Sequence, residues 1–246
     1  MGGVRISQLD IPLDAFYDLF FLLTRGYPRG EALELVKRKY GLSRREAILL
    51  ARCIHSENVS KLVKNKLVIP RDLFNAKLVV DGFNQLATIY AALMGVPVFV
   101  CSDGLTRDAL LSGPRLVIEN IRTLAGILAD VLRAIKPGKV VIVLDSQPSH
   151  SGDAAAFLRR SLNGLNALVE VSRTADKRVI EYALAGYVAA SSDIAIVMKV
   201  GKVFDLAGFA IRKTLSQRAK VNIIPQLLET LHSRWCVKRG GGKKGP

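Results

Sequence analysis

The chain has 246 residues, of which 50% are hydrophobic and 23% are charged. This composition excludes an intrinsically disordered protein, and the length suffices for one α/β domain with an accessory element. The formal net charge is +15, with 36 Lys and Arg against 21 Asp and Glu, which favours a polyanionic partner such as a nucleic acid.

The positive charge is concentrated in the two flanks of the chain. Residues 1–70 carry a net charge of +5 and residues 212–246 carry +8, whereas residues 71–211 carry only +2. Basic flanks around a nearly balanced centre that holds most of the aspartates suit RNA or DNA binding, because Lys and Arg neutralise phosphates and release counterions. Solubility or adaptation to heat is the alternative explanation for such a charged surface.

The sequence favours neither a membrane protein nor a disulfide-stabilised protein. The apolar run Ala15–Leu23 is too short to span a bilayer, and the residues before it lack the basic region of a signal peptide. Cys53, Cys101 and Cys236 are far apart and show no CxxC spacing, so neither a disulfide framework nor a zinc site is expected. We therefore expect a cytoplasmic protein with no membrane partner, and a homodimer is left open as its assembly.

Residues 1–70 are predicted to form an N-terminal helical region. Ser43-Arg44-Arg45-Glu46 has the pattern of a capping box, in which Ser43 and Glu46 satisfy each other's backbone amides. A capped basic helix after a Gly-containing turn indicates a helix-turn-helix-like unit in which Arg44 and Arg45 contact nucleic acid. A simple helical packing unit is the alternative. The helices are expected over residues 13–24, 31–40 and 43–56.

Residues 71–213 are predicted to form an α/β domain. Short β-branched runs alternate here with helix-length segments, a pattern typical of a three-layer α/β/α fold with a mainly parallel sheet. The strands are expected over residues 77–80, 97–101, 139–144, 167–172 and 186–190. The intervening helices are expected over residues 85–94, 115–135, 154–165 and 175–185.

Residues 214–246 are predicted to form a basic helix followed by a disordered tail. Arg212 and Lys213 precede this segment, and we expect them to contact nucleic acid. One alternative concerns the last strand, because Ile194–Val200 could replace Gly186–Ala190. The earlier segment is preferred because it places Asp193 at the carboxyl end of a strand.

Aspartates follow most of the predicted strands. Right-handed crossovers bring the carboxyl ends of parallel strands to one edge, where ligand sites form. A single aspartate there is commonly a helix cap or turn residue, but several together repel each other unless a cation neutralises them. Oxygen ligands without His or Cys favour Mg²⁺ or Mn²⁺. The aspartates concerned are Asp81, Asp103, Asp108, Asp145, Asp176 and Asp193.

Several of these motifs resemble the PIN-like nucleases, particularly the NYN branch. They are Val80-Asp-Gly-Phe-Asn84, Val141-Ile-Val-Leu-Asp145, Asp176 at the start of a helix, and Ala189-Ala-Ser-Ser-Asp193. Together with CSDGLTRD they are also similar to a little-characterised archaeal group of that clan. The resemblance covers about residues 75–210.

The resemblance implies a PIN-like fold and metal-dependent RNA cleavage. Asp81, Asp145, Asp176 and Asp193 would be catalytic residues that face a Mg²⁺ or Mn²⁺ ion. Asn84, Ser191 and Ser192 would orient these carboxylates or the scissile phosphate.

The chain departs from the family pattern at the second strand. Many PIN proteins place a Glu in the helix after that strand, and the nearest candidates here are Asp103 and Asp108. Arg107 lies between them and could hold a phosphate or pair with either aspartate.

The function predicted from the sequence is therefore a metal-dependent ribonuclease. A non-catalytic RNA- or DNA-binding protein and a metal-dependent enzyme acting on nucleotides are the alternatives. ATP or NAD use has no support, because neither a P-loop pattern nor a GxGxxG motif after a strand is present.

Overall fold

The computed structural model describes residues 11–108 and 113–230. The chain forms two compact units, and both are built from more than one segment. The first comprises residues 1–62, 99–107 and 221–246, and the second comprises residues 63–98 and 108–220. The tail predicted to be disordered lies outside the described residues. The basic helix predicted from residue 214 is wrong in part, because residues 221–223 form a strand.

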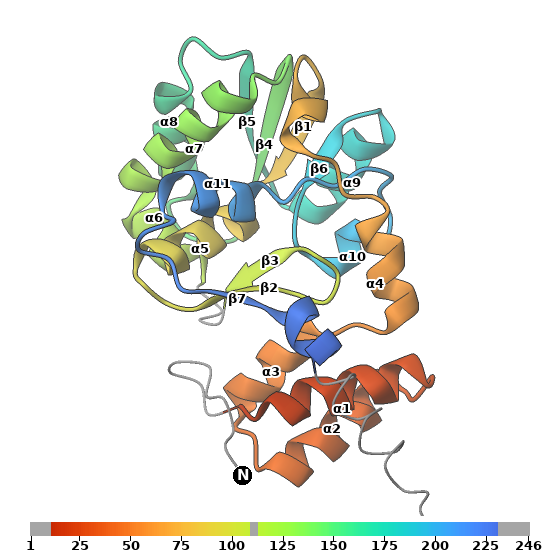
Figure 1. Ribbon diagram of the computed structural model, residues 1–246. Helices are drawn as coiled ribbons and strands as arrows, with labels where there is room; N and C mark the ends of the chain where they lie inside the picture. Colours follow the sequence, from red (N-terminus) through yellow and green to blue (C-terminus); the bar gives the residue numbers. More distant parts are fainter. Residues whose placement is uncertain (1–10, 109–112, 231–246) are drawn as a thin grey trace, which may run out of the picture. The chain divides into compact units, whose positions relative to one another are not determined.

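The N-terminal part of the first unit is helical, as predicted (Figure 1). The capping box is confirmed, because Ser43 Oγ accepts from the Glu46 amide at 3.3 Å and Glu46 Oε2 accepts from the Ser43 amide at 2.8 Å. The helices are α1 (Leu13–Thr24), α2 (Arg29–Tyr40), α3 (Arg44–Cys53) and α4 (Glu57–Lys64).

A three-stranded sheet of order β3-β2-β7 corrects one prediction. Its strands are β2 (Val98–Val100), β3 (Thr106–Asp108) and β7 (Val221–Ile223). The strand expected at residues 97–101 therefore does not join the parallel sheet. The physical reason is a tight turn, in which the Gly104 amide donates to Cys101 O at 2.9 Å and Gly104 takes a φ of 86°. Such a short turn folds the chain back on itself instead of sending it across to a parallel strand.

The second unit contains a four-stranded parallel sheet of order β5-β4-β1-β6. Its strands are β1 (Lys77–Asp81), β4 (Lys139–Asp145), β5 (Ala167–Ser172) and β6 (Val188–Ala190). The central strands β1 and β4 are almost entirely buried, as expected for strands covered on both faces. The four strands predicted here are confirmed.

Helices cover both faces of the parallel sheet, which is consistent with a three-layer arrangement. Figure 1 shows α7 and α8 on one side of the sheet and α9 on the other. The helices are α5 (Gly82–Leu93), α6 (Pro114–Glu119), α7 (Ile121–Ile135), α8 (Ser151–Ser161), α9 (Ala175–Leu184), α10 (Ile194–Val197) and α11 (Leu206–Thr214), with a 3₁₀ turn at Pro70–Leu73. In the described parts of the chain, no helix is long and apolar enough to cross a membrane.

Two helical segments differ from the predictions. The helix expected at residues 115–135 is divided into α6 and α7, because Asn120 leaves the helical conformation at φ −111° and ψ 14°. The alternative strand at Ile194–Val200 is wrong, since Ile194–Val197 is the helix α10. Asp193 therefore follows β6, as the preferred interpretation requires.

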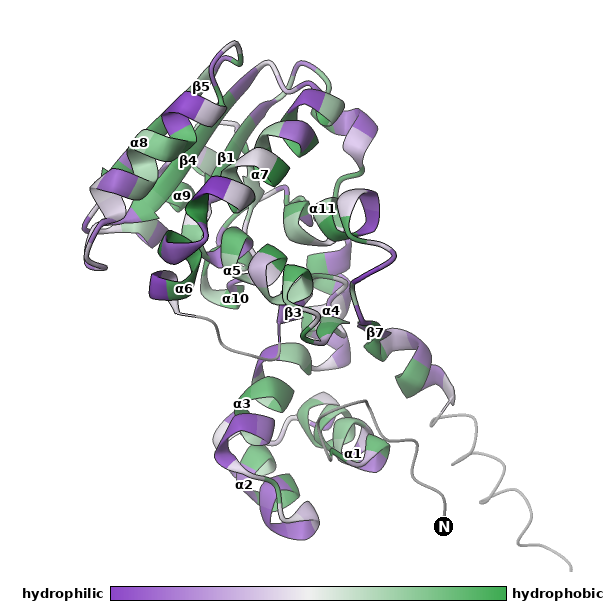
Figure 2. Cartoon of the chain, turned by 90° about the vertical axis from the view of Figure 1, so that its left-hand side faces the viewer, coloured by the Kyte–Doolittle hydropathy of each residue, from purple (hydrophilic) through white to green (hydrophobic). Residues whose placement is uncertain are grey.

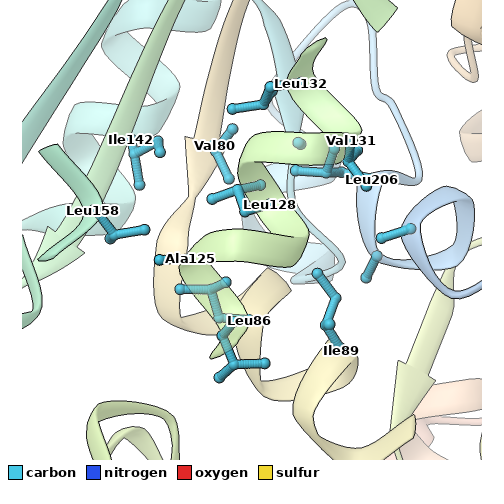
Figure 3. Packing of buried hydrophobic residues seen from close by; sticks show 14 of the residues in the cluster. Val80, Leu86, Ile89, Ala125, Leu128, Val131, Leu132, Ile142, Leu158 and Leu206 are labelled. Carbon is cyan, nitrogen blue, oxygen red and sulfur yellow. The ribbon is translucent and has the colours of Figure 1, made fainter. Parts of the chain in front are cut away.

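The core of the second unit lies between the parallel sheet and the helices α5, α7 and α8. Figure 3 shows Val80 and Ile142 of the sheet packed with Leu128 of α7, and all three side chains are fully buried. In Figure 2, β4 has the green of hydrophobic residues, whereas α8 mixes hydrophobic and hydrophilic residues. This packing fixes the position of each strand end at the edge of the sheet.

Candidate active site

The strands β1 and β6 are neighbours, and their carboxyl ends place Asp81 beside Ser191. Val80 pairs with Ala190 in the parallel register, so the next residue of each strand lies at the same edge. Ser191 Oγ donates to Asp81 Oδ2 at 2.8 Å and accepts from the Asp193 amide at 3.1 Å. One buried hydroxyl thus connects the two predicted carboxylate residues.

The chain leaves these two strand ends in opposite directions. After β1 it enters α5, on the same side of the sheet as α7, whereas after β6 it enters α10, which contacts α9 (Figure 1). Ligands of open α/β sheets bind in the crevice where neighbouring strands diverge in this way. The topology therefore favours this edge as a ligand site.

Asn84 holds the end of β6 through its side-chain oxygen. Asn84 Oδ1 accepts from the backbone amide and from the hydroxyl of Ser192, each at 3.0 Å. Gln85 Nε2 donates to the same oxygen at 2.8 Å, while Gln85 Oε1 accepts from the Ala207 amide at 2.9 Å. Gln85 is a site residue that the sequence reasoning missed, although a polar residue in an apolar helix directly after Asn84 was a usable signal.

Asp81 is a buried carboxylate with a strongly altered affinity for protons. Its pKa is raised to about 7, mainly by burial and also by the negative charges of Asp176 and Asp193. The hydrogen bond from Ser191 and the nearby amide of Asn84 act in the opposite direction. Asp81 occupies the N-cap position of α5, yet its side chain makes no capping hydrogen bond. The Asn84 amide is at the N3 position of this helix, so a weak cap contact stands beside the place of Asp81 among the carboxylates.

Asp176 links the other carboxylates electrostatically. It lies in the first turn of α9, and its pKa is raised by partial burial and then by the charges of Asp193 and Asp145. Lys199 lowers this pKa. The charge of Asp176 thus acts on Asp81, and the charges of Asp193 and Asp145 act on Asp176, in line with the expected gathering of these aspartates at one edge.

Two of these aspartates also have the local roles that any strand-terminal aspartate can take. Asp193 Oδ1 caps α10 by accepting from the Ala195 amide at 2.9 Å, and Asp145 Oδ1 accepts from the Gln147 amide at 2.9 Å. In each of the two residues, this hydrogen bond is accepted by the Oδ1 atom. A cap or turn role therefore does not exclude a ligand on Oδ2.

A hard cation matches the chemistry of this site better than a soft one. The side chains around Asp81 offer carboxylate, amide and hydroxyl oxygens, and no sulfur or imidazole is among them. Within the described residues, however, no group of three or more His, Cys, Asp or Glu side chains is placed to hold a metal ion. Any cation here would need carboxylates that come closer together, or water and phosphate as its remaining ligands.

Asp103 and Arg107 do not belong to this edge, which corrects two predictions. Arg107 donates to both oxygens of Asp103, at 2.8 and 2.7 Å, and the two side chains are buried in the first unit. Of the interpretations left open for Arg107, pairing with Asp103 is confirmed. A guanidinium that is only 2% exposed is not available to a nucleic acid.

Asp108 is buried at the end of β3 and accepts from Thr88 Oγ1 at 3.4 Å. Thr88 lies one helical turn after Asn84 in α5, so Asp108 contacts the helix that carries Asn84. Four basic residues predicted to bind nucleic acid are exposed. Arg44 and Arg45 lie on α3, and Arg212 and Lys213 lie on α11. Nucleic-acid binding by these four residues stays a prediction.

Comparison with known proteins identifies a family whose description names no activity. A family described as "Protein of unknown function (DUF434)" matches residues 13–66. An uncharacterized protein of Methanocaldococcus jannaschii is 31% identical over 155 residues, which make up 63% of this chain and 74% of that protein. No solved structure matches the chain. Because a second family model matches residues 70–209, more than half of the chain, the protein belongs to the family described as "Domain of unknown function (DUF5616)".

Proposed function

We propose that this protein is a Mg²⁺- or Mn²⁺-dependent ribonuclease of the PIN-like type, acting in the cytoplasm. The observation that carries the proposal is the buried Asp81 carboxylate, whose pKa of about 7 reflects burial and the charges of Asp176 and Asp193. Several carboxylates in one crevice are unfavourable for folding unless they serve a ligand. The parallel sheet with helices on both faces supports the resemblance to PIN-like nucleases at the level of fold class.

The donor groups fit a magnesium-type ion, with Asp81 and Asp193 as the first residues to hold it. Mg²⁺ is usually bound through one or two carboxylates, with water and substrate phosphate as further ligands, so a group of three protein ligands is not required. When bound, the ion would polarise the scissile phosphate and favour a hydroxide nucleophile.

The residues of the chain have positioning roles in this proposal. Ser191 fixes Asp81 Oδ2 and the backbone of Asp193 at once. Asn84 holds the Ser192 backbone, so that β6 and α5 keep their spacing. Asp176 and Asp145 add negative charge at the edge of the site, which strengthens the attraction for a cation.

A non-catalytic nucleic-acid-binding protein is the second candidate. It is favoured by the lack of a ready-made three-residue metal group in the described residues. This candidate predicts RNA binding that survives the replacement of all four aspartates and does not depend on divalent cations.

A cleavage assay tests the proposed function. Purified protein is incubated with single-stranded and structured RNA, with Mn²⁺ or with EDTA. We expect cleavage only with the metal, and its loss in Asp193→Asn. The matched control is Asp130→Asn, which alters an exposed aspartate of α7 that pairs with Arg133 at 3.2 Å. Equal activity in Asp193→Asn and Asp130→Asn would contradict the proposal.

A further inference from the structure

A solvent-open hollow lies next to Asp145 on the surface of the second unit. Its volume is about 820 Å³, within the range of about 300–1,000 Å³ typical of small-ligand sites. It lies between the α6 segment 114–119 and the segment 147–150 that follows β4. Because the Gln147 amide donates to Asp145 Oδ1 at 2.9 Å, the hollow begins at the carboxylate edge.

The lining of the hollow has little net charge. Arg115 is paired with Glu119 at 2.9 Å, and His150 is paired with Asp153 at 2.9 Å. The remaining lining is largely apolar, with Gln147 and Ser149 as polar groups. Such a surface suits the flat face of a nucleobase better than a phosphate, because Pro114, Ile118 and Pro148 offer apolar contact and the charged side chains are already paired.

Two arginines flank an aromatic ring on the helices that continue from the hollow. Arg122 Cζ lies 5.9 Å and Arg160 Cζ lies 4.5 Å from the centroid of the Phe157 ring. Arg122 is in α7, directly after α6, while Phe157 and Arg160 are in α8, which begins after His150. Figure 1 shows α6, α7 and α8 on the same side of the parallel sheet.

Within the described residues, no acidic side chain pairs with these two arginines. Arg122 and Arg160 are exposed, and in that part of the chain they make ring contacts with Phe157 but no ion pair. An aromatic ring holds each guanidinium by a cation–π interaction and leaves its N–H groups free for phosphate oxygens. The pair therefore offers two pre-positioned phosphate contacts on the helices that continue from the hollow.

We propose that a single-stranded RNA segment binds along this surface, with a base in the hollow and neighbouring phosphates on Arg122 and Arg160. The inference rests on the proposed function for the choice of RNA, and it adds where the strand lies and that it is unpaired. A double helix would not fit, because its bases are stacked and cannot enter a hollow. The path leads from the α7–α8 surface to Asp145 at the catalytic edge.

Fluorescence anisotropy with a labelled single-stranded RNA tests this inference in EDTA, so that cleavage does not interfere. The test variant is Arg122→Glu with Arg160→Glu. The control is Lys77→Glu with Lys139→Glu, the exposed first residues of β1 and β4, which pair at the opposite edge of the same sheet. This control reverses the same charge and also includes a cation over a ring, since Lys77 Nζ lies 5.7 Å from the Tyr187 centroid.

We expect the arginine variant to bind at least about 10-fold more weakly and the lysine variant to bind within about 3-fold of wild type. The slope of log affinity against log salt should fall by about 1.4 in the arginine variant, as for two lost phosphate contacts on a single strand. Circular dichroism checks that both variants are folded.

The inference would be overturned by equal losses in the two variants, by no RNA binding in wild type, or by duplex RNA binding with the same arginine dependence. Measuring binding and cleavage separately distinguishes a failure of this inference from a failure of the proposed function. Arginine-dependent binding without any cleavage in Mn²⁺ would support the strand path and contradict the nuclease. Metal-dependent cleavage with unchanged RNA binding in the arginine variant would support the nuclease and contradict the strand path.

Discussion

Ser191 Oγ donates a 2.8 Å hydrogen bond to Asp81 Oδ2, although the two residues are 110 positions apart in the chain. The bond closes the gap between the neighbouring strands β1 and β6 at their carboxyl ends. It stabilises the charged form of a carboxylate that burial and two neighbouring aspartates make easier to protonate. Ser191 therefore keeps Asp81 available as an anion near neutral pH.

We predict that Ser191→Ala weakens both metal binding and RNA cleavage. Removing the hydroxyl raises the pKa of Asp81 further, so that more of the carboxyl group is protonated at pH 7. Changes in residues that orient metal ligands typically cost 10–100-fold in affinity or activity, and we expect a loss of about that size. Titration calorimetry with Mn²⁺ measures the affinity. Ser192→Ala is the control, because the Ser192 amide still donates to Asn84.

We predict that Asp81→Asn raises the stability of the folded protein at pH 8 in EDTA. A carboxyl group whose pKa rises from 3.8 to about 7 on folding leaves stability unaffected below its unfolded pKa. It destabilises the fold increasingly as the pH rises from 3.8 to about 7, and the effect is constant above that. Removing it should increase the free energy of unfolding by as much as about 4 kcal/mol at pH 8 and by little at pH 4.

Urea unfolding of wild type, Asp81→Asn and the exposed-site control Asp130→Asn measures this effect. A stability gain that is the same at pH 4 and pH 8 would show that the Asp81 charge is not the cause.

We predict that Gly82→Ala disrupts the start of α5. A Cβ atom at this position would lie 2.9 Å from Val143 O and closer still to Leu144 Cδ2, so the turn between β1 and α5 must shift. The shift would move Asn84 away from Ser192 and lower both stability and cleavage. Gly126→Ala is the matched control, because a Cβ there meets no atom within 4 Å and should stabilise α7 by up to about 1 kcal/mol.

Thermal unfolding of the two glycine variants checks this expectation. If Gly82→Ala were as stable as Gly126→Ala, the close approach of α5 to β4 would be in error.

We predict that the stability of the first unit falls as the pH drops below 6.5, because of His55. The pKa of His55 is lowered to about 4, mainly by burial and also by the charges of Arg107 and Arg29, while the charge of Asp103 acts in the opposite direction. His55 Nδ1 therefore accepts from Arg29 Nη2 at 2.9 Å, and the neutral ring lies 3.5 Å from Asp103 as a neighbour rather than an ion-pair partner.

Because the folded pKa of His55 is lowered, its contribution to stability is fully present above the unfolded pKa of 6.5. This contribution is lost as the pH falls from 6.5 toward 4. Between pH 7 and pH 5 the loss should be about 2 kcal/mol. Urea unfolding of wild type and of His55→Asn, which keeps an acceptor for Arg29, measures it. A variant with the same pH dependence as wild type would contradict the assignment to His55.

The elements that could be predicted are those whose patterns are local. The strands of the parallel sheet are apolar on both faces, and the capping box of Ser43 and Glu46 is defined within one turn. The position of Asp81, Asp145 and Asp193 at one edge followed from the parallel order of the strands.

The errors came from contacts that the patterns leave open. The Asp103-Gly104 turn folds β2 into the three-stranded sheet, and this dipeptide is a hairpin signal that follows the apolar run directly. The pairing of Asp103 with Arg107 depends on the burial of both groups. The hollow beside Asp145 depends on how α6 packs, which no local pattern specifies.

The most direct test of the central claim is the rate of RNA cleavage by wild type and by Asp81→Asn, each with Mn²⁺ and with EDTA. The account predicts metal-dependent cleavage by wild type and a loss of more than about 100-fold in Asp81→Asn, beyond the loss typical of residues that only orient metal ligands. Equal rates for the two proteins in Mn²⁺ would contradict the assignment of the carboxylate edge as the catalytic site.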